Sequence, residues 1–489
     1  MEKSVVNFNP THSKYIEYIM ALSGKKLIRL GYPEGPVIGL ALSVIQQHYK
    51  KLKKEELNIL LKTVLENPSE YTEHEYLGSI AKSLLPPQGT PKSFELRKNN
   101  PAFAIYGGAD IEPIALNQME TAMCLPIAQE GALMPDAHPG YGLPIGGVLA
   151  TQNAVIPYGV GVDIGCRMCM SIYDLPTQKL EQDKNTFTKM LMDHTRFGHA
   201  TFQKPIDHAV LERKEFKEIP IAQSLKDRAY KQIGSSGGGN HFVEFGLVEI
   251  VDAHNEYQLP LGEYLAVLSH SGSRGLGASI ANYYTKLAMQ TCQLPQHAKH
   301  LAWLDLDSEA GQEYWLAMNL AGDYASACHH QIHERLSQAM GEQARVRIEN
   351  HHNFAWKEQN AQGDEIIVHR KGATPAGKGA LGIIPGSMTS PGFIVRGKGN
   401  SLSINSTSHG AGRVMSRTKA KKNLSAKVVK QHLQKAGITL IGSGLDEAPM
   451  VYKDIHQVMA HQKELVEIIG KFIPKIVRMC GDHRFIEVD

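Results

Sequence analysis

The sequence has little of what would place a chain in a membrane or outside the cell. It lacks an N-terminal signal that is charged and then apolar, and it has no apolar run long enough to span a bilayer. Its six cysteines are scattered through 489 residues, which does not indicate a disulfide framework. We therefore expect a cytoplasmic protein with no membrane partner, in which most cysteines are buried thiols.

Excess charge of one sign is also missing. Lys and Arg total 52 against 49 Asp and Glu, a formal net charge of +3. A bulk basic field is thereby excluded, so a nucleic-acid site would have to be a local patch. The chain also lacks a regular internal repeat and a dinucleotide-binding βαβ fingerprint. These absences argue against a repeat protein and against a doubly wound nucleotide-binding sheet.

Residues 1–95 differ in texture from the rest. Apolar residues recur at helical spacing in Pro36–Lys54 and again in Glu55–Leu65, and Pro86–Pro91 is typical of a linker. No chemical motif falls in this segment. We predict a small helical N-terminal extension over 1–95 that serves as a packing or docking module.

From about residue 98 onward, short β-rich runs alternate with Gly-rich loops, and helical patterns follow some of them. This texture predicts an α+β fold, a single large catalytic domain of mixed sheets and helices over 96–489. The expected strands include Gly146–Ala150, Tyr264–Ser269, Ile366–Val368 and Phe393–Val395, and the expected helices include Ala278–Gln290 and Arg413–Lys422.

Five polar residues in Gly-flanked strings are candidate metal ligands. A carboxylate and a thiolate three residues apart, Asp163 and Cys166, can converge on one cation, although a turn aspartate beside a buried cysteine is the better interpretation of that pair alone. His241, His270 and His352 each lie in a polar string, and the string after His270 runs into a helix whose N-terminus could hold an anion. A lone histidine is more often a satisfied polar side chain. Four such sites in one chain favour metal or phosphate chemistry, but spacing does not show that they meet.

Three strings are candidate phosphate or nucleotide sites. Gly372–Gly379 resembles a P-loop but lacks the Ser/Thr after Lys378 and a following helix, so we reject it. Pro385–Met388 is a tight turn that could contact a nucleotide or be an ordinary turn. His409 stands at an expected loop-to-helix junction ahead of a basic helix, where imidazole could attack phosphorus. For Lys421 and Lys422 a solvated face is the preferred interpretation.

Taken together and in order, these strings resemble the RtcB family of RNA-splicing ligases. The resemblance runs from about residue 98 to the C-terminus. It is carried by Met134–Gly147, Gly161–Cys166, Gly239–Phe242, His270–Gly275, His352-Asn353, His369–Thr374, Pro385–Met388 and Ser408–Arg413.

The resemblance implies a centre of two Mn²⁺ ions and a GTP site. Cys166 would bridge the ions, with Asp163 and His241 completing one half and His270 and His352 the other. His409 would be guanylylated by GTP, and Arg274 and Arg413 would clamp phosphate. The residues implied to hold the guanylate are Asn240, His241, Phe242, Val243, Glu244, His352, Asn353, Pro385, Gly386, Ser387, Met388, His409, Gly410, Ala411 and Gly412.

The implied reaction joins an RNA 3′-phosphate or 2′,3′-cyclic phosphate to a 5′-hydroxyl through histidine–GMP. Two other functions stay open: a metal-dependent phosphoesterase acting on RNA ends, and a non-catalytic protein that binds RNA ends. The chain departs from the family pattern at two places. Arg484–Asp489 lacks the usual C-terminal lysine, and Gly392 stands where a pocket serine is usual. We therefore expect weaker discrimination between GTP and ATP than typical family members have.

Overall fold

Two compact units make up the computed structural model, which describes residues 23–33, 36–50, 52–85, 91–99 and 101–481. One unit comprises the chain up to Thr90 together with Glu212–Asp227. The other comprises Pro91–Leu211 and Arg228–Asp489. The grouping of Glu212–Asp227 with the N-terminal unit is a long-range relationship that local sequence patterns do not report.

The N-terminal unit contains the helices α2 (Gly24–Leu30), α3 (Pro36–His48), α4 (Lys54–Glu66) and α5 (Gly78–Leu84). The two helices predicted here are confirmed, although the first ends at His48. Glu56 accepts a hydrogen bond from the backbone N–H of Lys53 at 2.8 Å, which fixes the start of α4. Leucine, isoleucine and valine side chains from all four helices form one buried core. Residues 86–90 of the expected linker lie outside the described residues.

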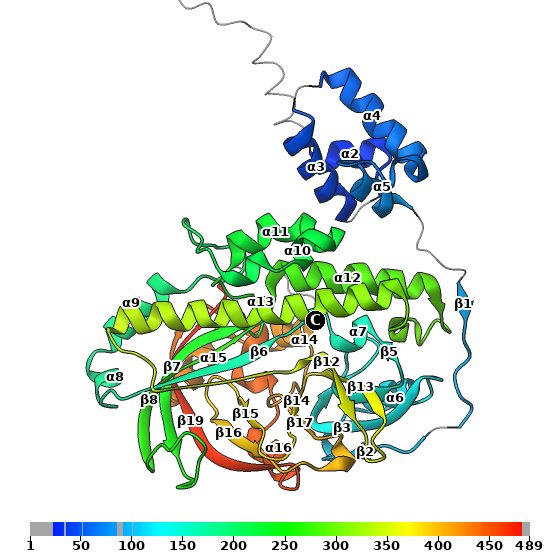
Figure 1. Cartoon of the computed structure of the whole chain (residues 1–489). Coiled ribbons are helices and arrows are strands. Elements are labelled where there is room, and N and C mark those ends of the chain that lie inside the picture. The colour runs from blue at the N-terminus through cyan, green and yellow to red at the C-terminus, as the bar shows by residue number, and fades with distance from the viewer. Residues whose placement is uncertain (1–22, 34–35, 51, 86–90, 100, 482–489) are drawn as a thin grey trace, which may run out of the picture. The chain divides into compact units, whose positions relative to one another are not determined.

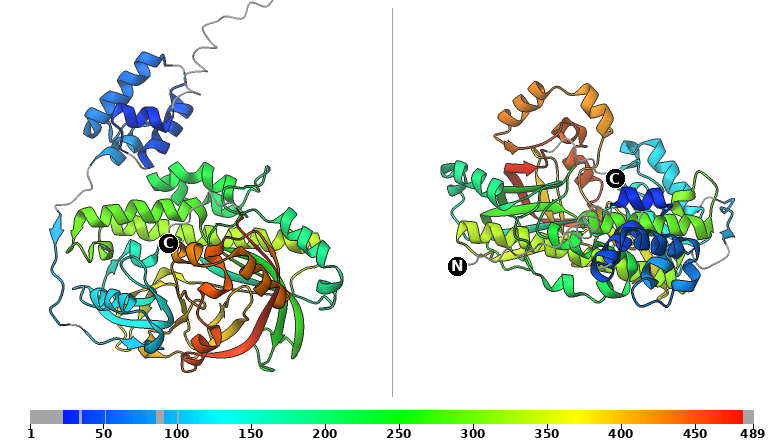
Figure 2. Two further views of the ribbon diagram at one scale, coloured as in Figure 1. Left: turned by 180° about the vertical axis from the view of Figure 1, so that it is seen from behind. Right: turned by 90° about the horizontal axis from the view of Figure 1, so that it is seen from above.

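An eight-stranded sheet forms the larger half of the second unit (Figure 1). Its neighbours pair antiparallel, except that β18 (Thr439–Ile441) runs parallel to β19. Figure 2 shows β19, drawn in red, curving alongside the green strands β7 and β8. The remaining strands, in spatial order, are β11 (Val346–His351), β6 (Arg167–Tyr173), β8 (Gly262–Ser271), β7 (Phe242–Ile250), β19 (Val466–Met479), β16 (Gly392–Gly397) and β15 (Leu381–Ile384).

A five-stranded sheet forms the smaller half. Its order is β12 (Asn353–Gln359), β13 (Glu365–Lys371), β4 (Ile145–Thr151), β3 (Ala128–His138) and β2 (Ala104–Ile105). Three two-stranded pairs complete the strands: β14 (Ala373–Pro375) with β17 (Ser406–Ser408), β1 (Lys92–Ser93) with β9 (Cys292–Gln293), and β5 (Ala154–Val155) with β10 (Leu304–Asp305). All four strands predicted from the sequence are confirmed within these sheets, so the α+β fold is as expected.

Two long helices, α12 (Arg274–Thr291) and α13 (Glu309–Met340), pack against each other, and α13 crosses one face of the larger sheet (Figure 1). Side chains of β6 alternate between the two faces, as strand geometry requires. Met168 and Met170 join the core of one face, whereas Tyr173 packs with Ile332 and Leu336 of α13 on the other. The helix side and the opposite side of the sheet are therefore separate environments.

Among the remaining helices of the chain, one prediction was wrong at its start. A helix was expected from Arg413, but α14 begins at Arg417 because Ser416 caps it by accepting a hydrogen bond from Lys419 N at 3.3 Å. None of the described helices is both long enough and apolar enough to cross a membrane. The others are α6 (Pro113–Met123), α7 (Pro157–Val160), α8 (Lys179–Gln182), α9 (Lys184–His194), α10 (Glu215–Glu218), α11 (Pro220–Gln232), α15 (Ala426–Lys435) and α16 (Ile455–Ala460).

Candidate active site

Four of the five candidate metal ligands lie where neighbouring strands of the larger sheet begin or end. Antiparallel pairing in the order β11, β6, β8, β7 brings the ends of β11 and β8 beside the starts of β6 and β7. Cys166 directly precedes β6, and His241 directly precedes β7. His270 is the penultimate residue of β8, and His352 is the single residue between β11 and β12. Strand order thus gathers residues that are far apart in the sequence.

The side chains of these residues meet in one buried cluster. Sγ of Cys166 lies 3.2 Å from Nε2 of His270 and 3.4 Å from Nε2 of His241. Nε2 of His270 lies a further 3.2 Å from Nε2 of His352. A carboxylate oxygen of Asp163 lies 3.1 Å from Nε2 of His241. The five residues form a continuous path of ligand atoms with Cys166 at its middle.

The protonation of His270 fits a cation ligand. Nδ1 of His270 lies 3.2 Å from the backbone oxygen of Asn240, which can only accept, so this nitrogen carries the proton. Nε2 therefore directs a lone pair toward Cys166 and His352. Burial, and next the charge of His241, hold the pKa of His270 well below its usual value. Burial, and next the charge of His409, do the same for His352, so both rings are neutral, the form that binds metal.

Asp163 occupies the helix N-terminus where an anion was expected. Oδ1 of Asp163 accepts a hydrogen bond from Ser273 N at 3.0 Å, directly before α12. A Cβ atom on Gly272 would lie 1.9 Å from Oδ2 of Asp163, so only glycine admits the carboxylate here. Burial favours the neutral acid, but the hydrogen bond and charge of His241 outweigh it and lower the pKa of Asp163. The carboxylate is ionised and fixed.

The donor set fits divalent cations. It combines one thiol, one carboxylate and three imidazoles, a mixture that suits borderline ions better than Mg²⁺ or Ca²⁺. The lone pair on Nε2 of His270 faces Nε2 of His352 at 3.2 Å, so either a proton or a cation can lie between the two nitrogens. The residues present can therefore hold the metal that the sequence implied.

His409 follows β17 and lies in a loop eight residues before α14 begins at Arg417. The helix junction expected at this position was wrong. Nδ1 of His409 lies 2.7 Å from Oδ2 of Asp136, and the His409 ring lies 5.0 Å from that of His352, centroid to centroid. Burial raises the pKa of Asp136, but the charge and hydrogen bond of His409 more than offset this and lower it. An ionised carboxylate only accepts, so Nδ1 carries a proton, and in the neutral ring the lone pair lies on Nε2.

Asp136 is a residue of the candidate site that sequence reasoning missed. It lies in Met134–Gly147, one of the strings that carry the resemblance, but the string itself gave Asp136 no role. Its neighbours are held in place because Nζ of Lys453 donates to the backbone oxygens of Pro135 and Ala137 at 3.0 and 2.9 Å. A carboxylate in a strand followed by an Ala-His pair was the available signal.

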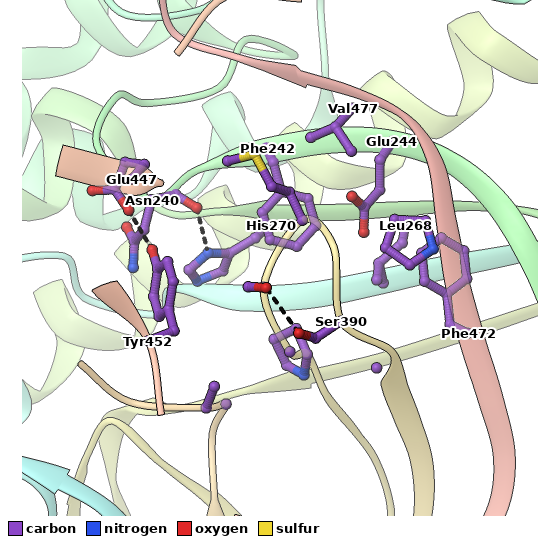
Figure 3. A pocket seen from close by; sticks show the side chains of 18 of the residues that line it. Asn240, Phe242, Glu244, Leu268, His270, Ser390, Glu447, Tyr452, Phe472 and Val477 are labelled. Atoms are coloured by element: carbon purple, nitrogen blue, oxygen red, sulfur yellow. Dashed lines mark hydrogen bonds between the residues drawn. The ribbon is translucent and has the colours of Figure 1, made fainter. Parts of the chain in front are cut away.

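A pocket of about 690 Å³, its open mouth included, adjoins this cluster. Figure 3 shows the side chains of Phe242, Glu244 and His270 extending into it from β7 and β8. Ten of the residues expected to hold a guanylate line it: Asn240, Phe242, Glu244, Pro385, Gly386, Ser387, Met388, His409, Gly410 and Ala411. Residues that were not foreseen also line it, among them Leu268, Glu447, Tyr452, Phe472 and Val477.

The other expected nucleotide residues do not line the pocket. Val243 packs in the core on the α13 side, since alternate residues of β7 face opposite ways. His241 and His352 belong to the cluster of metal-ligand candidates, and Asn353 accepts a hydrogen bond from Gly372 N at 2.8 Å. Gly412, at φ +72°, lies against the backbone of Asp136. A Cβ atom on Gly412 would lie 2.0 Å from the backbone oxygen of Asp136.

One of the two departures from the family pattern, Gly392, falls at this pocket. Gly392 lines it, but so does Ser390, whose hydroxyl lies 3.0 Å from that of Ser387 (Figure 3). A serine hydroxyl is therefore supplied from two residues earlier in the chain. Arg484–Asp489 lies outside the described residues.

The two candidate phosphate clamps make hydrogen bonds within the protein. Arg274, buried and at φ +58°, donates from Nε to Ser235 Oγ at 3.2 Å. Arg413 donates to the backbone oxygen of Asp446 at 2.7 Å and pairs with Glu447 at 3.3 Å. Since Glu447 lines the pocket, Arg413 reaches the site through that carboxylate.

Comparison with known proteins agrees with this geometry. The family model described as tRNA-splicing ligase RtcB matches residues 118–221 and 207–479. The chain is 35% identical over 404 residues to "RNA-splicing ligase RtcB" of Escherichia coli K12, covering 76% of this chain and 95% of that protein. It is 30% identical over 439 residues to "tRNA-splicing ligase RtcB" of Nanoarchaeum equitans, covering 75% and 91%. A similar protein of Mycobacterium tuberculosis is 31% identical over 420 residues, covering 71% and 96%. The chain belongs to the RtcB family.

Proposed function

We propose that the chain is a GTP- and Mn²⁺-dependent RNA ligase that joins a 3′-phosphate or 2′,3′-cyclic phosphate end to a 5′-hydroxyl end. Relatives named as RNA-splicing ligases support the class of reaction. The observation that carries the mechanism is the hydrogen bond from Nδ1 of His409 to Asp136, because in the neutral ring it leaves the other nitrogen as a nucleophile beside the pocket.

The first chemical step forms a histidine–GMP adduct. Nε2 of His409 attacks the α-phosphorus of GTP, a P–N bond forms, the bond to the β-phosphate oxygen breaks, and pyrophosphate leaves. The ring gains positive charge as this happens. Asp136 stabilises that charge through the 2.7 Å hydrogen bond and keeps the attacking nitrogen aimed at the pocket.

Two transfers complete the reaction. An oxygen of the RNA 3′-phosphate, formed by hydrolysis where the end is a cyclic phosphate, attacks the phosphorus of the adduct. The P–N bond breaks and His409 is regenerated. The 5′-hydroxyl of the second RNA end then attacks the activated 3′-phosphorus, loses its proton, and expels GMP.

The metal-ligand residues would hold two Mn²⁺ ions beside His409. The bound ions would neutralise phosphate charge during transfer. Asp163 and His241 fit one half of the centre and His270 and His352 the other, with Cys166 between them. His352 is the ligand beside the nucleophile, with its ring centroid 5.0 Å from that of His409.

Glu244 is the residue best placed to select the base. Its carboxyl group is buried in the pocket, where burial holds its pKa well above the usual value. Guanine presents two N–H donors on one edge, and their hydrogen bonds would favour the ionised carboxylate, which accepts both. Adenine presents an acceptor at the position of one of these donors, so the same contact would disfavour ATP.

Labelling with GTP separates this proposal from the two other functions. The full-length protein should retain α-³²P label after incubation with labelled GTP and Mn²⁺ and denaturing electrophoresis, and His409→Ala should retain none. A phosphoesterase and a simple RNA-end binding protein would both stay unlabelled. His461→Ala is the matched control, because Nε2 of His461 pairs with Asp110 at 3.1 Å on the surface and His461 does not line the pocket. Absence of label on the metal-loaded wild type would refute the proposal.

A further inference from the structure

A second group of metal-ligating side chains lies on the α13 side of the larger sheet. The ligand atoms of Cys169, His329 and His333 all lie within 4.8 Å of one another, and all three residues are buried. His329 and His333 are four residues apart on α13 and so share one face of the helix. Cys169 belongs to β6. Nothing in the proposed function uses this group.

The imidazoles are oriented as metal ligands usually are. Nε2 of His329 lies 3.0 Å from the backbone oxygen of Ser271 and must donate to it, so Nδ1 carries a lone pair. That Nδ1 lies 2.6 Å from Oγ of Ser269, and Nε2 of His333 lies 2.8 Å from the same oxygen. The outer Nδ1 of His333 lies 2.8 Å from Oγ of Ser171. Each ring thus anchors its outer nitrogen on an oxygen, as metal-bound histidines do, and turns its inner nitrogen toward Oγ of Ser269.

Burial prepares the three side chains for a cation. It lowers the pKa of His329 to about 3 and that of His333 well below its usual value, so both rings are neutral. It raises the pKa of the Cys169 thiol, which therefore stays protonated until a cation displaces its proton. A thiolate, two imidazoles and one oxygen are a donor set that suits tetrahedral zinc.

We propose that Cys169, His329 and His333 bind one Zn²⁺ ion, with Oγ of Ser269 at the fourth position. Binding takes Zn²⁺ from solution, forms a Zn–S bond and releases the thiol proton to solvent. The ion joins α13 to β6 and β8. Because Ser269 and Ser271 flank His270 in β8, the same ion stiffens the strand end that presents His270 on the opposite face. The proposal stands independently of the ligase reaction.

The competing account is a hydrogen-bonded network without metal. The hydroxyl of Ser269 would donate a hydrogen bond to Nδ1 of His329. The N–H at Nε2 of His333 would donate a hydrogen bond to the Ser269 oxygen. That arrangement satisfies both rings and leaves Cys169 as a buried thiol. Metal content decides between the two accounts.

The test uses the full chain carrying Cys166→Ala and His352→Ala, which disable the first cluster and leave Cys169 as the one thiol among the residues of the two clusters. After growth with zinc and gel filtration, mass spectrometry should find about one Zn²⁺ per chain in this parent. Adding His329→Ala or His333→Ala should remove it. Adding His330→Ala should not, because His330 lies on the same helix but is half exposed and pairs with Glu349 at 3.3 Å. A folded parent without zinc, or zinc that persists in both alanine variants, would overturn the proposal.

A spectroscopic measurement protects the test against unfolding of those variants. Loading the folded parent with Co²⁺ should give thiolate-to-cobalt absorption in the near ultraviolet, and Cys169→Ser should abolish that absorption. A cobalt-loaded parent without a thiolate band would contradict the assignment of Cys169 as a ligand.

Discussion

Oδ2 of Asp136 lies 2.7 Å from Nδ1 of His409, although 273 residues separate the two in sequence. The same oxygen accepts hydrogen bonds from the backbone N–H groups of His409 at 3.1 Å and Gly410 at 3.3 Å. One buried carboxylate oxygen therefore fixes the tautomer of the ring and the loop that carries it. The proposed nucleophile is positioned by β3, which belongs to the smaller sheet.

Asp136→Asn should slow guanylylation while leaving metal content unchanged. An amide cannot stabilise the charge that develops on the ring, and it can impose the wrong tautomer, so we expect a loss of about 10²–10⁴-fold in the rate of GMP labelling. Asp110→Asn, in the surface His461–Asp110 pair, is the control and should label at the wild-type rate. Equal rates for both variants would remove Asp136 from the mechanism.

Gly272→Ala should weaken metal binding without unfolding the chain. Its Cβ would lie 1.9 Å from Oδ2 of Asp163, so the carboxylate must move away from His241. Loss of a correctly placed ligand should reduce Mn²⁺ affinity about 10–100-fold, measured by calorimetric titration. Gly377→Ala is the control, because a Cβ there meets nothing within 4 Å. An unaltered affinity in Gly272→Ala would mean that Asp163 is not a ligand.

Chelation should abolish labelling reversibly. Treatment with EDTA should remove activity, and added Mn²⁺ should restore it, because the cluster consists of side chains held by strand ends rather than by the ion alone. Added Mn²⁺ should not restore labelling in Cys166→Ala. It should restore labelling in Cys124→Ala, which alters a half-buried thiol directly after α6. Activity that survives thorough chelation would contradict a metal-dependent ligase.

Base selectivity should depend on Glu244. Gly392 lines the pocket where a serine is usual in the family, so we expect ATP to compete with GTP more effectively than in typical members. Glu244→Gln should reduce the preference for GTP over ATP further, because an amide offers one acceptor oxygen where a carboxylate offers two. Competition of unlabelled ATP against labelled GTP measures this. Strict GTP selectivity in the wild type would show that other residues, such as Ser390, compensate.

The sequence predicted the helices and strands better than it predicted which side chains contact one another in the fold. Strands such as Tyr264–Ser269 were recognisable because a buried strand is an unbroken apolar run, and α12 because its apolar residues follow a helical period. The start of α14 was misplaced because the cap at Ser416 decides it, not the pattern around Arg413. Local signals of this kind extend over only a few residues.

Residues of the candidate site were predicted through motifs, and its unforeseen members were missed because their contacts join distant parts of the chain. Asp136 and Glu447 come from parts of the chain whose proximity to His409 or Arg413 depends on sheet order. Arg274 and Arg413 looked like phosphate clamps because arginine suits phosphate, but their partners inside the fold could not be read from spacing. Long-range pairing of side chains is what the sequence alone leaves out.

The most direct test of the covalent-histidine account compares two substrates with His409→Ala. The variant should fail to join RNA with a 3′-phosphate to RNA with a 5′-hydroxyl in the presence of GTP and Mn²⁺. It should still join a 3′ end that already carries GMP, because that step bypasses the histidine, and this activity also shows that the variant is folded and holds metal. Joining of unactivated ends by His409→Ala at a rate comparable to the wild type would contradict the account.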